Sequence, residues 1–173
     1  MNWKLLLPIV LVAPALAFAQ SKGPSDPQIA GIVVTANQID IDAGKLAKPR
    51  SQNKEVKDFA QQMITDHSAV NKQAGALAKK LGITPADSDT TKSLKQGAAD
   101  NVAKLKALKG AQFDKAYVDH EVAYHQAVLD AIDKVLVPSA QNPELKGLIV
   151  KVRPAIATHL EHAKHLQATV GKK

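Results

Sequence analysis

The 173-residue sequence contains no cysteine, which excludes disulfide bonds and metal sites built on thiolates. Aromatic residues make up only 3% of the chain, whereas surfaces that bind nucleic acid usually interleave aromatic with basic side chains. We therefore expect no nucleic-acid partner. The chain also lacks a glycine-rich phosphate loop and the Gly-x-Ser-x-Gly turn of serine hydrolases, which argues against nucleotide and serine chemistry.

The first nineteen residues have the composition of a secretory signal peptide. Lys4 supplies a short charged region, an apolar stretch covers residues 5–16, and the small residues of a cleavage site follow at 17–19. The apolar stretch is too short to span a bilayer comfortably, so a retained anchor is the weaker alternative. The sequence therefore predicts an exported, periplasmic protein with a signal peptide over residues 1–19.

The remaining chain has the length of one domain. Residues 20–26 are predicted to form a short N-terminal segment, and residues 27–170 a single domain with its own core. Removal of the signal peptide takes away one lysine and lowers the formal net charge from +7 by one. Lysine-rich segments such as LAKKL either keep the protein soluble or contact an anionic surface of the cell envelope. Alanine-rich helices favour association into oligomers, but the sequence does not determine the number of subunits.

Proline, glycine and capping residues divide the domain into helices. Strand signals are nearly absent, and the composition is rich in Ala, Leu and Lys. Pro154 either bends the last helix or divides it into two. We predict an all-α fold, an up-down four-helix bundle with an additional short helix between its second and third long helices. The expected helices cover residues 26–48, 52–81, 90–108, 111 to Pro138, and 143–170, with an N-cap at Asp26 and helix-ending residues at Pro49, Gly82 and Gly110.

Apolar residues recur every three or four positions along each long helix and indicate its inward face. His67, His125 and His159 each occupy such an inward position near the middle of a different helix. On the first helix, Asp40 lies at the edge of the core face. A lone inward histidine is usually a core residue with one hydrogen bond. Three of them on three helices meet at the same height in an up-down bundle, which favours a shared site.

A metal ion would satisfy these side chains together. Each buried imidazole left without a partner would cost about 1–3 kcal/mol. Three imidazoles and a carboxylate suit zinc, copper(II), nickel or iron. We therefore predict a single divalent transition metal bound by Asp40, His67, His125 and His159, with a small interior ligand or one hydrogen-bonded cluster as alternatives.

Three further side chains are candidates to support these ligands: Asp66, Glu121 and His162. Asp66 points about 100° away from the neighbouring histidine, where it caps another group or meets water. Glu121 lies one turn before His125 and either orients that imidazole or forms an exposed pair. His162 lies three residues after His159 and is expected to contribute to the site only from its side, if it contributes at all. Two other histidines are expected to face solvent, His120 and His165.

Three segments carry a resemblance to a known family: FAQQMITDHSAV, FDKAYVDHEVAYHQAVLD and VRPAIATHLEHAKHL. They are similar to the motifs of exported bacterial proteins catalogued as domain of unknown function 4142 and often labelled outer membrane proteins. The resemblance covers residues 29–166 and implies export and a ferritin-like four-helix fold, whereas the activity of the family is not established. It also places recurring polar positions of the family on Asp40, Asp66, His67, His125 and His159.

A ferritin-like fold raises the alternative of dimetal oxidation chemistry, and the residues argue against it. Such sites take a Glu-x-x-His pair from each of two helices, and this sequence contains no such pair and few inward carboxylates. No nucleophile or acid–base pair is evident, so we assign no catalytic residue and place an enzyme third among the function classes. The leading hypothesis is a periplasmic bundle that binds a metal ion or small ligand. The alternative is an envelope structural or interaction protein whose histidines form a hydrogen-bonded network and whose basic faces contact anionic partners.

Overall fold

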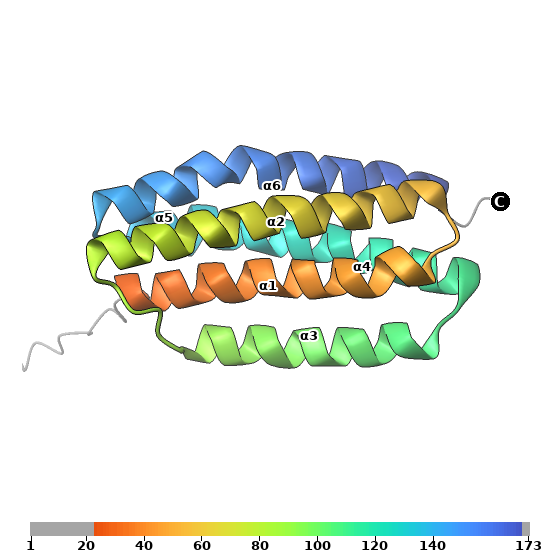
Figure 1. Cartoon of the computed structure of the whole chain (residues 1–173), viewed down its shortest axis with the longest axis horizontal. Coiled ribbons are helices and arrows are strands. Elements are labelled where there is room, and N and C mark those ends of the chain that lie inside the picture. The colour runs from red at the N-terminus through yellow and green to blue at the C-terminus, as the bar shows by residue number, and fades with distance from the viewer. Residues whose placement is uncertain (1–22, 171–173) are drawn as a thin grey trace, which may run out of the picture.

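The computed structural model describes residues 23–170, in which every regular element is a helix (Figure 1). The predicted all-α class is therefore confirmed, while the predicted signal peptide lies outside the described residues. No helix in the described part of the chain is long and apolar enough to cross a membrane. The elements are α1 (Asp26–Arg50), α2 (Lys54–Leu81), α3 (Asp89–Ala107), α4 (Gly110–Ala131), the π-helix η1 (Ile132–Leu136), α5 (Val137–Ser139) and α6 (Pro143–Thr169).

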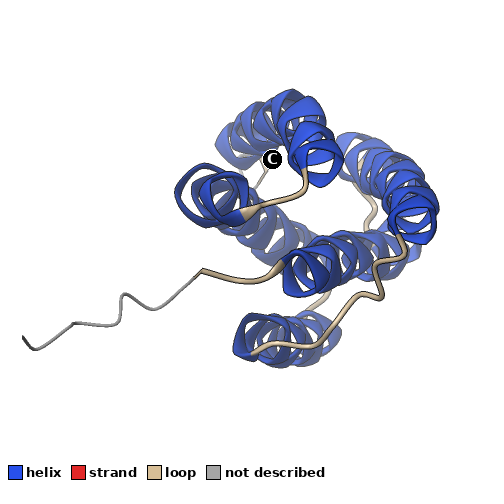
Figure 2. Ribbon diagram, turned by 90° about the vertical axis from the view of Figure 1, so that its left-hand side faces the viewer, coloured by secondary structure: helices blue, strands red, loops and turns tan. Residues whose placement is uncertain are grey.

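Helices α1, α2, α4 and α6 surround one core, and α3 packs on its outside against α1 and α4 (Figures 1 and 2). Successive long helices alternate in direction along the molecule (Figure 1). Because α3 carries the chain back along the length of the bundle, α4 runs in the same direction as α2. Both α1 and α6 contact α2 and α4, so every neighbouring pair in the core is antiparallel.

Capping residues set the helix boundaries. Asn53 and Asn142 begin α2 and α6, and each side chain accepts a backbone N–H of the first turn at 2.9 Å. Gly82 ends α2 with a φ of 65°, as predicted. The N-cap of α1 differs from the prediction, because it is Ser25 rather than Asp26. The Asp26 carboxylate instead accepts two backbone N–H groups of the loop before α6, both at 2.9 Å.

Prolines interrupt the helices less than predicted. Pro49 lies inside the last turn of α1, where a missing N–H removes only one hydrogen bond near a helix end. Pro138 lies inside α5, the short helix that directly follows η1. At the end of η1, the Val137 N–H donates to the Ile132 carbonyl. This wider π-type turn relieves the clash between a proline ring and the carbonyl four residues earlier. Pro154 lies within α6, which is therefore one continuous helix.

The core has two apolar ends and a polar middle. One apolar cluster includes Phe59, Met63 and Leu166, and the other includes Ile29 and Ile149. Buried polar side chains require partners to offset their loss of water, and six of the nine in the described residues lie in a layer between the two clusters. This layer contains Asn37, Asp40, His67, Glu121, His125 and His159.

Candidate metal centre

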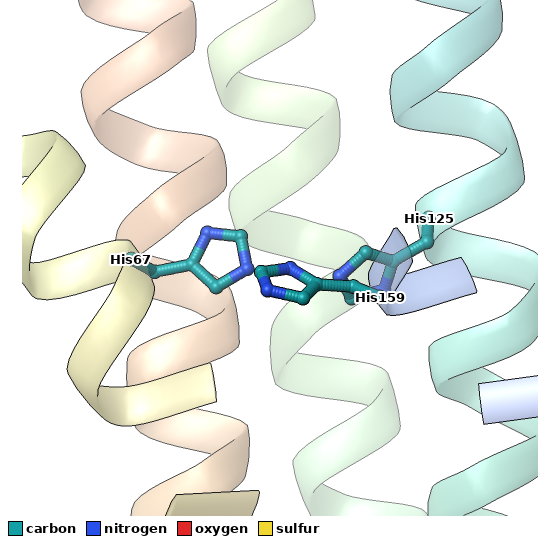
Figure 3. Close-up of side chains that lie close together, drawn as sticks. All are labelled: His67, His125 and His159. Atoms are coloured by element: carbon teal, nitrogen blue, oxygen red, sulfur yellow. The ribbon is translucent and has the colours of Figure 1, made fainter. Parts of the chain in front are cut away.

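Three histidine side chains meet in the middle of the bundle (Figure 3). His67 comes from α2, His125 from α4 and His159 from α6, and their ring centroids lie 5.3, 5.6 and 5.7 Å apart. One ring nitrogen of each lies within 4.8 Å of those of the other two. Each residue is at most 3% exposed. The structure thus brings together three of the four side chains predicted as ligands in one compact triangle.

The ring nitrogens that face away from the triangle have oxygen partners. His67 Nδ1 lies 2.7 Å from Asn37 Oδ1, and the Asn37 Nδ2 group donates to the Val33 carbonyl at 2.9 Å. His125 Nδ1 lies 2.9 Å from the backbone carbonyl of Glu121. Because a carbonyl oxygen only accepts, each Nδ1 must carry the hydrogen. The Nε2 atom of each ring is therefore left with a lone pair.

His159 is held in the same way by its other nitrogen. Its Nε2 lies 2.9 Å from Asp66 Oδ2, so Nδ1 carries the lone pair. Asp66 therefore does cap a neighbouring group, which was one of the two alternatives for it. Within the triangle, the three ring nitrogens without a hydrogen-bond partner among the described residues are His67 Nε2, His125 Nε2 and His159 Nδ1. Metal-bound histidines have this pattern, with the second nitrogen donating to an oxygen.

The surroundings keep these imidazoles neutral. Burial, and then the nearness of His125 and His159, lowers the pKa of His67 to about 3. Burial lowers the pKa of His125 to about 4, although its bond to the Glu121 carbonyl opposes the shift. The pKa of His159 is lowered by burial against the opposing effect of Asp66. At neutral pH all three rings can offer a lone pair, which a metal ion requires.

Two carboxyl groups lie beside the triangle. Asp40, predicted at the edge of the core face, is only 3% exposed, and its Oδ2 atom lies 3.5 Å from His67 Nε2. Asp40, Glu121 and His125 form a second group whose ligand atoms lie within 4.8 Å of one another. Burial and Glu121 raise the pKa of Asp40 well above its usual range, and burial raises the pKa of Glu121 to about 8. The pair therefore retains at least one proton at neutral pH.

Glu121 differs from both sequence alternatives. It is fully buried rather than exposed, and its backbone carbonyl orients His125. The carboxylate Oε2 lies farther away, 3.4 Å from His125 Nδ1. The expectation of few inward carboxylates is also revised, because Asp40, Asp114 and Glu121 are all buried. Helical spacing places Glu121 one turn from an inward histidine, but only packing against α1 decides its burial.

Two histidines near the triangle do not belong to it. The Nδ1 atom of His162 lies 3.1 Å from Gln62 Oε1, and its ring meets Phe59 edge-on with centroids 5.1 Å apart. His162 therefore supports packing between α2 and α6 rather than the triangle. His120, expected at the solvent, is half-buried, because its ring stacks on Tyr124 with centroids 5.5 Å apart.

Asn37 is a site residue that the sequence prediction missed. It lies three positions before Asp40 on α1, and residues three apart share a helix face. Once Asp40 is placed beside the core, the same spacing places Asn37 there as well. The apolar pattern of this helix pointed to a neighbouring face, because α1 buries residues against both the core and α3.

The fold has known relatives. A family model described as "Domain of unknown function (DUF4142)" matches residues 12–166. A solved structure described as "CopM in the Cu(II)-bound form" is 13% identical, with a TM-score of 0.64 over 85% of this chain and 98% of that chain. The "DUF305 fragment from Deinococcus radiodurans" is 19% identical, with a TM-score of 0.67 over 84% of this chain and 99% of that chain. At these identities the likeness shows the fold alone. No curated protein matches the chain.

Proposed function

The chain belongs to the family described as domain of unknown function DUF4142, and we propose that it binds one divalent transition metal ion through His67, His125 and His159. The observation that supports this proposal is the convergence of three imidazole lone pairs in a buried layer. In a hydrogen-bonded cluster instead, a protonated Asp40 would serve His67 Nε2 at most, and His125 and His159 would need a further donor on the inner side of the triangle. All three ring hydrogens are engaged on the outer side. A cation satisfies three acceptors at once.

Asp40 is the proposed fourth ligand, because its carboxylate is 3.5 Å from the free nitrogen of His67. A divalent ion beside the carboxyl pair favours its ionised form, so metal binding should release protons. We propose one ion rather than two because His125 belongs to both candidate groups. Its Nδ1 hydrogen already bonds to the Glu121 carbonyl, which leaves this ring one lone pair.

Three imidazoles and one carboxylate suit copper(II), zinc, nickel or iron(II). Copper(II) is the first ion to test, since one structure of similar fold is described as Cu(II)-bound. When bound, the ion would link α2, α4 and α6 through their buried histidines and stabilise the folded state. Storage, buffering or protection against free metal are roles that such binding supports.

The test measures metal content and stability of chelator-treated protein produced without residues 1–19. Dialysis against each ion should give one bound ion per chain, and a ligand at a hundredfold excess over Kd should stabilise the fold by about 2.7 kcal/mol. Single His→Gln substitutions at residues 67, 125 and 159 should each weaken binding. His165→Gln is the matched control, because His165 is exposed on the same helix as His159. The proposal is contradicted if the three variants bind the metal as the wild type does, or if His165→Gln loses metal affinity to the same extent as they do.

Two further features belong to this proposal. We infer a ferritin-like core from the crossover through α3, since such bundles have one long crossover connection.

We also propose that the protein acts in the periplasm after loss of residues 1–19, which cell fractionation and N-terminal sequencing would test. Contact between the lysine-rich faces and an anionic envelope surface stays a prediction, as does the wider envelope role that was the alternative hypothesis.

A further inference from the structure

An apolar cavity of about 170 Å³ lies beside the polar layer of the bundle. Its walls come from α1, α2, α3, α4, η1 and α6, and none of its lining side chains is charged. Two residues of the π-helix, Ile132 and Leu136, form part of this lining. Irregular turns of this type are frequent at functional sites. Asn37 also lines the cavity, so the same side chain borders the cavity and holds His67.

Two of the three polar side chains in this lining already make hydrogen bonds. Asn37 donates to a backbone carbonyl of α1 at 2.9 Å, and its oxygen accepts from His67. The Tyr124 hydroxyl donates to another backbone carbonyl of α1 at 3.2 Å. The third, Thr90, is exposed at the start of α3. A ligand placed away from Thr90 would therefore meet mainly apolar side chains.

We propose that this cavity binds a neutral, apolar small molecule of about the size of benzene. An enclosed cavity of roughly 150 Å³ lined by Leu, Ile and Phe accepts benzene, and this cavity has a similar volume and an apolar lining but is partly open to solvent. A polar or charged ligand would lose its water without gaining a partner, which opposes its binding. The site is separate from the metal proposal, because its walls contain none of the three histidines.

Benzene, phenol and benzoate are the probes for this proposal. Chelator-treated protein without residues 1–19 is labelled at Ile, Leu and Val methyl groups and titrated with each probe by NMR. Benzene should cause saturable shifts centred on Val128, Ile132 and Ile156, which line the cavity. Phenol should bind more weakly, because its hydroxyl would lose water among mainly apolar side chains, and benzoate should cause no saturable shift at these methyls. Absence of saturable benzene shifts, or equal binding of the three probes, overturns the proposal.

Two variants test the location of the site. Val128→Phe fills the cavity from α4 and should abolish benzene binding. Val150→Phe is the matched control, because Val150 is 51% exposed and lies outside the cavity. If Val128→Phe does not fold, Ala131→Leu adds less bulk to the same wall and should weaken binding at least about tenfold. A folded filling variant that binds benzene as the wild type does overturns the proposal. The metal-free sample makes either result independent of the metal site.

Discussion

Asn37 and Asp66 each hold one imidazole of the triangle by the nitrogen that faces away from it. Their surroundings differ, since Asn37 is 6% exposed and the Asp66 side chain is 43% exposed. Water can replace the Asp66 carboxylate but cannot easily reach the position of Asn37. We expect Asn37→Ala to weaken metal binding by about 10- to 100-fold and Asp66→Ala to weaken it less. Competition titration against a chelator measures both, and equal losses would contradict this ranking.

Glu121 carries a prediction about alkaline pH. Burial raises its pKa from 4.5 to about 8, so the folded metal-free protein retains a proton that the unfolded chain loses above pH 4.5. The contribution of Glu121 to the free energy of unfolding should therefore fall between pH 4.5 and 8, by up to about 1.4 kcal/mol per pH unit, and a net fall should be seen above pH 6.5, where the histidines no longer oppose it. Glu121→Gln should flatten this slope in urea denaturation of chelator-treated protein. Parallel curves for the two proteins would refute the assignment.

At the scale of elements, α1 and α2 approach each other closely at Gly44. A Cβ atom at this position would lie 2.7 Å from the backbone oxygen of Ala60. Gly44→Ala should therefore destabilise the protein by about 1–3 kcal/mol through overpacking. Gly75 on α2 is the matched control, because a Cβ atom there meets nothing within 4 Å. Gly75→Ala should stabilise the helix by up to about 1 kcal/mol. Thermal denaturation should shift in opposite directions, and equal shifts would argue against this close contact.

At the scale of the whole molecule, the polar layer should give the metal-free protein a plateau of stability in pH. The pKa values of His67 and His125 fall from 6.5 to about 3 and 4. The unfolded chain therefore takes up protons below pH 6.5 that the folded state does not, and stability is lost as the pH falls toward these values. Glu121 and Asp40 act with the opposite sign above their ordinary pKa values of 4.5 and 3.8.

The two effects oppose each other between about pH 4.5 and 6.5, so the free energy of unfolding should vary little there and fall on both sides. Denaturant titrations at constant ionic strength, with chelator present, provide the measurement. Glu121→Gln removes one of the two opposing carboxyls, so the stability of this variant should rise with pH between about 4.5 and 6.5 and fall less steeply above pH 6.5. Stability that rises steadily up to pH 9 in the wild type would exclude a buried protonated carboxyl in this layer.

Much of the fold follows from local features of the chain. The ends of α2 and α6 agree with capping residues and glycine to within two or three residues, and the spacing of apolar residues placed His67, His125 and His159 on inward faces. At Pro49 and Pro138 the helices continue one or two residues beyond the predicted ends. The effect of these prolines depends on how the chain accommodates a missing hydrogen bond, by a late position in α1 and by the π-turn before α5.

The sequence by itself therefore determined an all-α protein and the helix face on which each of three histidines lies, because a helical repeat is a property of neighbouring residues. The tertiary structure decided which ring nitrogens converge, since Asn37, Asp66 and the Glu121 carbonyl come from particular packing partners. It also decided the burial of Glu121 and the apolar cavity. Both depend on how α1, α3 and α4 meet in space, and contacts between distant segments leave no periodic signal in a single sequence.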